Sequence, residues 1–185
     1  MKSRLLLLAL PLFFFACEAD DDEAIEETTT LVGLWTVTAY DLYSGSTCTG
    51  TPVWGLDSLT AMFGDDMSLS MEFTEDAVSF NMNLSADAIC SMMGATIDGD
   101  SCLSEYGNLA SADVCVTLGG TYANSTCTIT DNTSDYTTED DAITITTYAG
   151  TDSAEVQTGT WAITNNVLTM TVADDGSCAN FTLSK

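Results

Sequence analysis

The feature of this sequence that most limits its fold is a strict alternation of apolar and polar residues over short runs. The clearest runs are Met67–Phe73 and Val78–Leu84, and Glu75 and Asp76 lie in the link between them. Successive side chains of a strand point to opposite faces, so this pattern predicts a hairpin with one apolar face. Further strands are expected over Leu34–Tyr43, Cys127–Ile129, Ala142–Tyr148, Val156–Ile163, Val167–Val172 and Ala179–Leu183. Asn165-Asn166 suits a tight hairpin turn, because Asn tolerates positive φ. The pattern predicts an all-β fold of about eight strands, either an antiparallel barrel or a sandwich.

Near its start the chain has two basic residues, Lys2 and Arg4, followed by an apolar run over 5–15 and a small residue, Ala16, directly before Cys17. This order describes a secretory signal peptide over residues 1–16, and the run is shorter than the ~20 residues that a membrane-spanning helix needs. The junction resembles the lipobox of bacterial lipoproteins, although Phe14 stands where that motif favours Leu. The resemblance implies that Cys17 becomes the N-terminus and carries lipid, with acyl chains such as palmitate. The alternative is an ordinary secretory signal with a disulfide-bonded Cys17.

Lipidation would make the membrane itself the first partner of this chain, because two or more acyl chains anchor a protein stably. Residues 17–30, which read CEADDDEAIEETTT, are acidic and nearly free of large apolar groups, so they are expected to form a flexible tether. An acidic stretch after the lipidated Cys resembles a surface-display signal of some bacteria. The residue after the Cys is Glu18, whereas a signal for retention in the inner membrane would favour Asp at this position. In this respect the sequence resembles lipoproteins that are sorted to the outer membrane. We therefore expect a lipid-anchored protein of the cell envelope, on the outer membrane, at its periplasmic face or at the cell surface.

The charge of the chain excludes one class of partner. The sequence has 28 Asp and Glu against three Lys and Arg, and only Lys185 among these cations lies outside the expected signal peptide. Phosphate contacts need Lys and Arg, so nucleic acid is not expected as a partner. The acidic groups suit either a solvated surface in saline water or the collection of Ca²⁺. No stretch completes a calcium loop, and the best fragments, 98–100 and 174–176, also suit plain turns.

Six of the seven cysteines lie beyond Cys17, and an even number in an exported chain predicts disulfides. The six are Cys48, Cys90, Cys102, Cys115, Cys127 and Cys178, which allow 15 pairings. A structural zinc site is the rival interpretation, and the absence of His and of any Cys-x-x-Cys pair disfavours it. Apart from the Ca²⁺ alternative and the covalent lipid on Cys17, no metal or cofactor is expected.

Four of these cysteines belong to an internal repeat within residues 85–128. Cys90–Cys102 and Cys115–Cys127 each enclose eleven residues, with Gly four positions after the first Cys, and Ser-Ala-Asp precedes both segments, at 85–87 and at 111–113. The matched spacing predicts two small units, each closed by its own disulfide and stabilised by roughly 3 kcal/mol. Glycines at 94, 119 and 120 are expected to give the positive φ that ends a short helical turn. This insert is either a structural addition held in shape by its disulfides or a binding surface.

Two Gly-x-Trp sequences, Gly33–Trp35 and Gly159–Trp161, stand near the two ends of the expected strands. Together with the hairpin around Asn166 and the closing Phe181–Leu183, they resemble the lipocalin-like domains of bacterial lipoproteins. The resemblance implies an up-and-down barrel over residues 31–185, in which Trp35 closes one end with Gly33 close beneath it. First and last strands are neighbours in such a barrel, which implies a third disulfide, Cys48–Cys178, at one rim.

Catalysis is not expected, because a chain without His has no Ser-His or Cys-His couple, and Lys185 at the C-terminus is poorly placed for a Schiff base. The apolar faces consist of Met67, Leu69, Met71, Phe73, Val78, Phe80, Met82, Leu84, Ile143, Ile145, Leu168, Met170 and Val172. An eight-stranded barrel is wide enough either to be filled by such side chains or to hold one small ligand. Three functions follow: binding of a small apolar molecule, contact with a protein partner through the insert, or a calcium-dependent acidic surface module.

Overall fold

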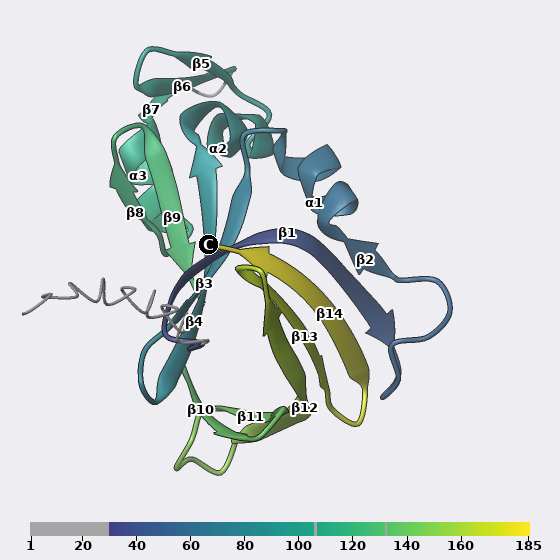
Figure 1. Cartoon of the computed structure of the whole chain (residues 1–185). Coiled ribbons are helices and arrows are strands. Elements are labelled where there is room, and N and C mark those ends of the chain that lie inside the picture. The colour runs from purple at the N-terminus through teal and green to yellow at the C-terminus, as the bar shows by residue number, and fades with distance from the viewer. Residues whose placement is uncertain (1–29, 106, 132) are drawn as a thin grey trace, which may run out of the picture.

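The computed structural model describes residues 30–105, 107–131 and 133–185, and in it the chain forms a closed eight-stranded antiparallel β-barrel (Figure 1). The wall consists, in order, of β1 (Gly33–Ser44), β3 (Ser68–Phe73), β4 (Ala77–Ser85), β10 (Ser134–Glu139), β11 (Ala142–Thr147), β12 (Glu155–Thr164), β13 (Val167–Ala173) and β14 (Ser177–Ser184). Each of these strands pairs with the next one along the wall, and β14 pairs with β1. The predicted all-β, up-and-down barrel is confirmed. The expected signal peptide, Cys17 and nearly all of the tether lie outside the described residues.

A β-bulge in β1 decides which of its side chains face the barrel interior. The pairing of β1 with β14 shifts register between Val37 and Ala39. Before the bulge Trp35 and Val37 are buried in the core, whereas after it Tyr40 and Leu42 are the partly buried residues that pack against the core. One extra residue thus moves the inward face from odd to even positions.

The two ends of the barrel differ in how they are sealed. At one end Trp35 fills the interior, and its indole N–H donates a hydrogen bond of 2.7 Å to the carbonyl of Leu31. The tight β12–β13 turn at this closed end has positive φ at Asn165 and Asn166, as predicted. At the other end β1 and β3 separate, because they pair only from Gly33 to Thr36. We call this second end the mouth.

A short helix covers the gap that β1 and β3 leave at the mouth. The chain passes from β2 (Trp54–Gly55), which pairs with β1, into α1 (Leu56–Phe63). Leu56, Leu59 and Phe63 of this helix pack against the core. The alternation that predicts the strands gives no indication of this helix.

The strand expected around Cys127 is β9 (Thr126–Thr130), but it is not the strand that closes the barrel. It pairs with the second half of β4, whereas β10 pairs with the first half of β4 at Ala77 and Val78. Both β9 and β10 therefore pair with β4, one with each half of it, with a break in the pairing between them. No strand is predicted over β10, because its sequence SDYTTE contains a single large apolar residue.

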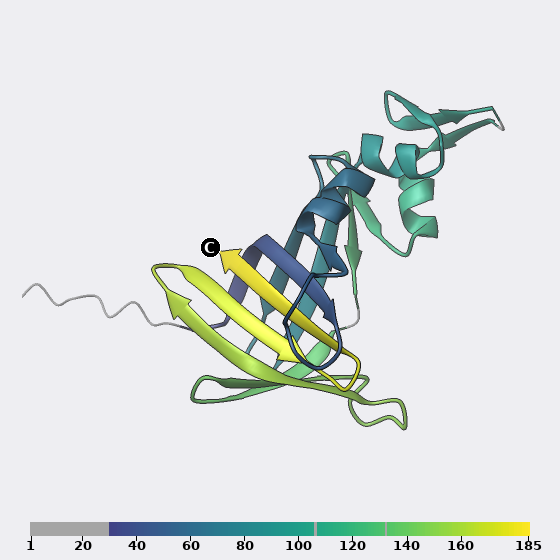
Figure 2. The same cartoon turned by 90° about the vertical axis from the view of Figure 1, so that its right-hand side faces the viewer.

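The insert is an arm that projects from the mouth end of the barrel (Figure 2). Its elements are α2 (Ala86–Met92), β5 (Thr96–Asp98), β6 (Ser101–Ser104), β7 (Gly107–Ala110), α3 (Ser111–Thr117) and β8 (Thr121–Ala123), followed by β9. Each unit has a helix and a hairpin, and each element of the first unit recurs 25 residues later in the second. The predicted internal repeat is therefore a repeat of structure.

The two units of the insert exchange strands and hydrogen bonds reciprocally. β4, which precedes α2, pairs with β9 of the second unit, and β7, which precedes α3, pairs with β6 of the first. The backbone N–H of Ala86 donates to the carbonyl of Ser125, and that of Ser111 donates to the carbonyl of Asp100. The arm therefore has an approximate internal two-fold symmetry.

This symmetry corrects the alignment of the two Ser-Ala-Asp sequences. Ser85 caps α2 by accepting a hydrogen bond from the N–H of Ala88, and its counterpart before α3 is Ala110. Ser111 is instead fully buried, with its hydroxyl 3.7 Å from the sulfur of Cys90. The matching tripeptide is thus one residue out of structural register.

Three disulfides hold the mouth and the arm. Cys90–Cys102 and Cys115–Cys127 each join a helix to the second strand of its hairpin, and Cys48–Cys178 joins the segment after β1 to β14 at the mouth. These are the predicted pairings. Gly94 and Gly119 have positive φ, as expected, whereas Gly120 is not among the residues with positive φ. A Cβ at position 120 would lie 2.8 Å from both sulfurs of Cys115–Cys127, so space is what requires this glycine.

Candidate ligand-binding site

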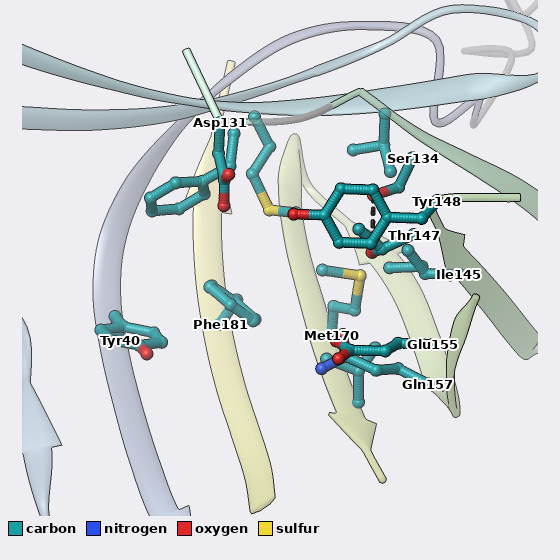
Figure 3. Close-up of a pocket in the computed structure, with 14 residues that line it drawn as sticks. Tyr40, Asp131, Ser134, Ile145, Thr147, Tyr148, Glu155, Gln157, Met170 and Phe181 are labelled. Carbon is teal, nitrogen blue, oxygen red and sulfur yellow. Dashed lines mark hydrogen bonds between the residues drawn. The ribbon is translucent and has the colours of Figure 1, made fainter. Parts of the chain in front are cut away.

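A cavity of about 400 Å³ occupies the mouth half of the barrel interior (Figure 3). Its lining comes from β1, β3, β4, β10, β11, β12, β13, β14 and the loops at the mouth, and it consists of Tyr40, Met71, Val78, Phe80, Asp131, Ser134, Ile145, Thr147, Tyr148, Glu155, Gln157, Met170, Val172 and Phe181. The interior of the barrel is therefore filled at the closed end and hollow at the mouth.

Three aromatic rings form one side of the cavity. The rings of Tyr40 and Phe181 lie 5.0 Å apart between centroids, and those of Phe80 and Phe181 lie 6.5 Å apart. Figure 3 shows Tyr40 and Phe181 side by side on neighbouring strands. Burial raises the pKa of the Tyr40 hydroxyl, so this group stays neutral at physiological pH.

The opposite side of the cavity is polar. The hydroxyls of Ser134 and Thr147 are hydrogen-bonded at 2.9 Å. Tyr148, the residue after β11, has a φ of 54° and points across the cavity toward the side where Asp131 lies (Figure 3). A tyrosine in the left-handed region is unusual, and such residues concentrate at functional sites. Glu155 lies beside Gln157 where β12 begins (Figure 3).

A turn rich in carboxylates lies next to the cavity. Asp174, between β13 and β14, accepts hydrogen bonds from the N–H groups of Gly176 at 2.8 Å and Ser177 at 2.6 Å, and from the Gln157 amide at 3.3 Å. The Gly176 N–H, followed by the smaller contributions of Ser177 and Gln157, holds the pKa of Asp174 below its ordinary value. Because Gln157 also lines the cavity, this turn helps to fix the polar wall.

A second cavity of about 480 Å³ lies beneath α1. Its lining is Tyr40, Leu42, Trp54, Leu59, Phe63, Leu69, Phe80, Met82, Ile129, Thr130 and Asp131. Tyr40, Phe80 and Asp131 line both cavities, so the two spaces adjoin. The mouth thus offers a polar-walled cavity and a largely apolar one on two sides of the same aromatic residues.

The residues singled out in the sequence as the barrel motif do not line either cavity. Trp35 closes the other end of the barrel, and Gly33 lies there with a φ of 126°. At Gly159 a Cβ would overlap the backbone of Thr171, so this glycine lets β12 and β13 approach closely. Trp161 packs against the core, with an indole N–H that is buried without a partner among the described residues. Both Gly-x-Trp sequences therefore shape the barrel.

The cysteines divide between the mouth and the arm. Cys48–Cys178 lies at the mouth, beside the Asp174 turn, and the other two disulfides lie in the arm. Cys17 lies outside the described residues. Within the described ranges, no group of three or more Cys, Asp or Glu is placed to hold a metal ion. The two candidate calcium fragments are the β5–β6 and β13–β14 turns, the first with positive φ at Gly99.

Sequence reasoning identified most of the apolar half of the cavity, although not Tyr40 and Phe181, and missed the polar half. Met71, Val78, Phe80, Ile145 and Met170 are all on the predicted apolar faces. The polar residues missed were Asp131, Ser134, Thr147, Tyr148, Glu155 and Gln157. Gln157 occupies an inward position of β12, on the same face as Trp161 and Ile163, and a polar residue on such a face is the one signal that could have revealed it. Ser134 gave no such signal, because β10 has a single large apolar residue.

In the part of the chain that the structure describes, no helix is long and apolar enough to cross a membrane. Comparisons with protein-family models, with curated protein sequences and with solved structures find no match to this chain.

Proposed function

We propose that this protein is a lipid-anchored lipoprotein of the cell envelope, related in kind to lipocalin-like domains, whose barrel binds one small apolar ligand without catalysis. The observation that carries the proposal is the 400 Å³ cavity at the mouth, with Met71, Met170 and the aromatic group in its lining. Binding pockets for small molecules measure about 300–1,000 Å³ and are lined mainly by apolar and aromatic side chains with a few polar groups. Methionine side chains adapt their shape to irregular ligands.

The position of the chain entry supports an outward-facing mouth. The first described residues lie at the closed end, where Leu31 is buried and accepts the hydrogen bond from Trp35. A lipid on Cys17 would therefore connect to the barrel at its closed end. In this arrangement the mouth and the arm are free to face away from the membrane.

The binding proposal is tested by filling the cavity. Met170→Trp places a larger side chain on its floor, and Val156→Trp places the same residue at an exposed position of β12 as a control. We expect at least a tenfold loss of affinity for a fluorescent apolar probe in the first variant and none in the second. Native mass spectrometry of protein from its own host provides the complementary readout, a bound small molecule. Equal probe binding by both variants would refute the cavity as the site.

The anchor is tested separately, because a ligand-binding barrel needs no lipid. In the native host, Cys17→Ser is expected to release the protein from membranes into the soluble fraction and to abolish labelling by a palmitate analogue. Retention of the variant in the membrane fraction, with labelling unchanged, would contradict lipidation at Cys17.

A second function, contact with a partner protein through the arm, is favoured by the free edge of β7. Asn83 and Leu84 of β4 correspond to Asn108 and Leu109 of β7 by the internal symmetry. Asn83 pairs with Ser68 of β3, whereas β7 is the last strand of its sheet among the described residues. Leu84 is 0% exposed and Leu109 is 46% exposed. Because β3 covers the equivalent edge of β4, we propose that the edge of β7 receives an extended segment of another protein, added as an antiparallel strand.

Crosslinking in intact cells tests this edge. With a photoreactive residue at position 109, we expect an adduct that survives Asn108→Ala and is lost in Asn108→Pro. The reason is that proline removes a backbone N–H from the edge while alanine keeps it. An adduct that persists in the proline variant would show a contact other than strand addition.

A further inference from the structure

We propose that the cavity at the mouth selects ligands that combine an apolar body with a positively charged group, such as an alkyl or aryl ammonium. This inference rests on the proposed binding function and names the chemical class of its ligand. The carrying observation is that the wall combines carboxylates with aromatic rings and contains no basic side chain.

Carboxylates surround the mouth on two sides. Asp131 follows β9 and lines both cavities, and Glu155 begins β12 on the other side of the first cavity. Glu155 also borders an outer groove that contains Asp174 and Asp175. Clefts lined by charges of one sign, with walls of low dielectric constant, focus the field and concentrate ions of opposite sign. A cation entering the barrel therefore approaches an acidic rim.

The only cation in the described part of the chain lies at the opposite end of the barrel. The Lys185 ammonium is 4.5 Å from the centroid of the Trp35 ring and donates a hydrogen bond of 3.1 Å to the carbonyl of Val32. It therefore lies away from the mouth, where Asp131 and Glu155 line the cavity. A carboxylate or phosphate on a ligand would meet no Lys or Arg in the cavity and would be repelled by the rim.

The uncharged part of the wall also suits an ammonium group. Tyr40, Phe80 and Phe181 present rings to the cavity, and a cation over an aromatic face is attracted by the ring quadrupole. The hydroxyl oxygens of Ser134 and Thr147 can accept hydrogen bonds from an ammonium N–H. The apolar body of the ligand would contact Met71 and Met170.

The test uses three probes with the same hydrocarbon chain and different head groups: decylammonium, decanol and decanoate. Dissociation constants are measured for the intact, oxidised protein at pH 7 and low ionic strength. We expect decylammonium to bind at least tenfold more tightly than decanol, and decanoate to bind more weakly than either. Because opposite charges are screened by salt, this preference should shrink at high salt.

Variants assign the preference to the two carboxylates. Asp131→Asn with Glu155→Gln preserves side-chain size, and we expect decylammonium and decanol to bind equally in this double variant. Glu139→Gln, at the β10–β11 turn of the closed end, removes a carboxylate far from the mouth and should leave the preference unchanged. Denaturant unfolding of each variant shows that the barrel remains folded.

The outcomes separate this inference from the binding function on which it rests. Equal affinity of the unmodified protein for all three probes would overturn the cation selectivity and leave apolar binding intact. A preference that persists in the double variant would overturn the assignment to Asp131 and Glu155. Absence of binding by any probe would overturn both the selectivity and the proposed use of the cavity.

Discussion

The two ends of this barrel are made from the same alternating strands and have opposite interiors. At the closed end the inward residues Trp35, Phe73, Leu168 and Leu183 are at most 1% exposed, and Trp35 fills the space between the strands. At the mouth the inward aromatic residues are only partly buried and line a cavity. Alternation therefore determines which face of a strand points inward, but it does not determine whether the interior is filled.

The difference between the ends has two structural causes. β1 pairs with β3 only from Gly33 to Thr36, so the wall is continuous at the closed end and opens toward the mouth. The mouth is then covered by α1 and held by the Cys48–Cys178 disulfide, whereas the closed end depends on packing. At the mouth a disulfide and a covering helix therefore take the place of the packed core that holds the closed end.

Removing the disulfide at the mouth tests this comparison with the largest expected effect. Cys48–Cys178 spans 130 residues, and the chain-entropy model gives about 4–5 kcal/mol for so long a loop. We expect Cys48→Ala with Cys178→Ala to lower the free energy of unfolding by roughly this amount, measured by denaturant titration. Cys90→Ala with Cys102→Ala removes a disulfide between residues only 12 positions apart in the sequence. This double variant should lower the free energy of unfolding by about 3 kcal/mol. An equal or smaller loss for the mouth disulfide would show that packing also holds the mouth.

A pair of aromatic truncations compares packing at the two ends. Trp35→Ala removes a side chain that is 1% exposed and leaves a cavity in a packed interior. We therefore expect the free energy of unfolding to fall by about 3–5 kcal/mol. Phe80→Ala enlarges a space that is already hollow and should cost about 1–2 kcal/mol. Trp54→Ala, at a residue that is 43% exposed, serves as the control. If Phe80→Ala cost as much as Trp35→Ala, the mouth would be packed as tightly as the closed end.

Much of the fold follows from local sequence. The alternating runs predict seven of the eight barrel strands, and the matched spacing of Cys90–Cys102 and Cys115–Cys127 predicts the two-unit arm. β10 was missed because inward Ser134 faces a cavity, so an apolar residue was not needed there. α1 was missed because it is only eight residues long, too short for a clear helical period.

The candidate site was harder to predict, because its polar members depend on contacts between distant segments. Ser134 and Thr147 meet through the pairing of β10 with β11, and Gln157 meets Asp174 across neighbouring strands. Nothing near Asp131 in the sequence indicates that it will lie at the break between β9 and β10. The acidic residues are scattered along the sequence, and those at the mouth come close together only in the folded barrel.

A smaller effect is expected from the acidic turn at the mouth. Because its hydrogen bonds hold the pKa of Asp174 lower in the folded protein than in the unfolded chain, its contribution to stability is fully present above the ordinary carboxyl pKa of about 3.9. That contribution is lost as the pH falls through the folded pKa. We expect Asp174→Asn to lower the free energy of unfolding by about 1 kcal/mol at pH 7. The difference in this free energy between the variant and the unmodified protein should disappear below about pH 4. Asp175→Asn removes the same charge from an exposed neighbour and serves as the control; a matching profile in this variant would indicate a general charge effect.

The smallest expected effect concerns the cation that covers the closed end. The Lys185 ammonium lies 4.5 Å from the Trp35 ring centroid and bonds the carbonyl of Val32, while its stem passes Gly33. Cation–π contacts at exposed sites contribute about 0.5–1 kcal/mol, so Lys185→Met should lower the free energy of unfolding by no more than about 1 kcal/mol. Lys185→Arg keeps the charge and should be nearly neutral. The same Met variant should leave the cation preference of the mouth unchanged, because the charge that it removes lies at the other end. A change in that preference would show that the two ends are electrostatically coupled and that Lys185 opposes the acidic rim across the length of the barrel.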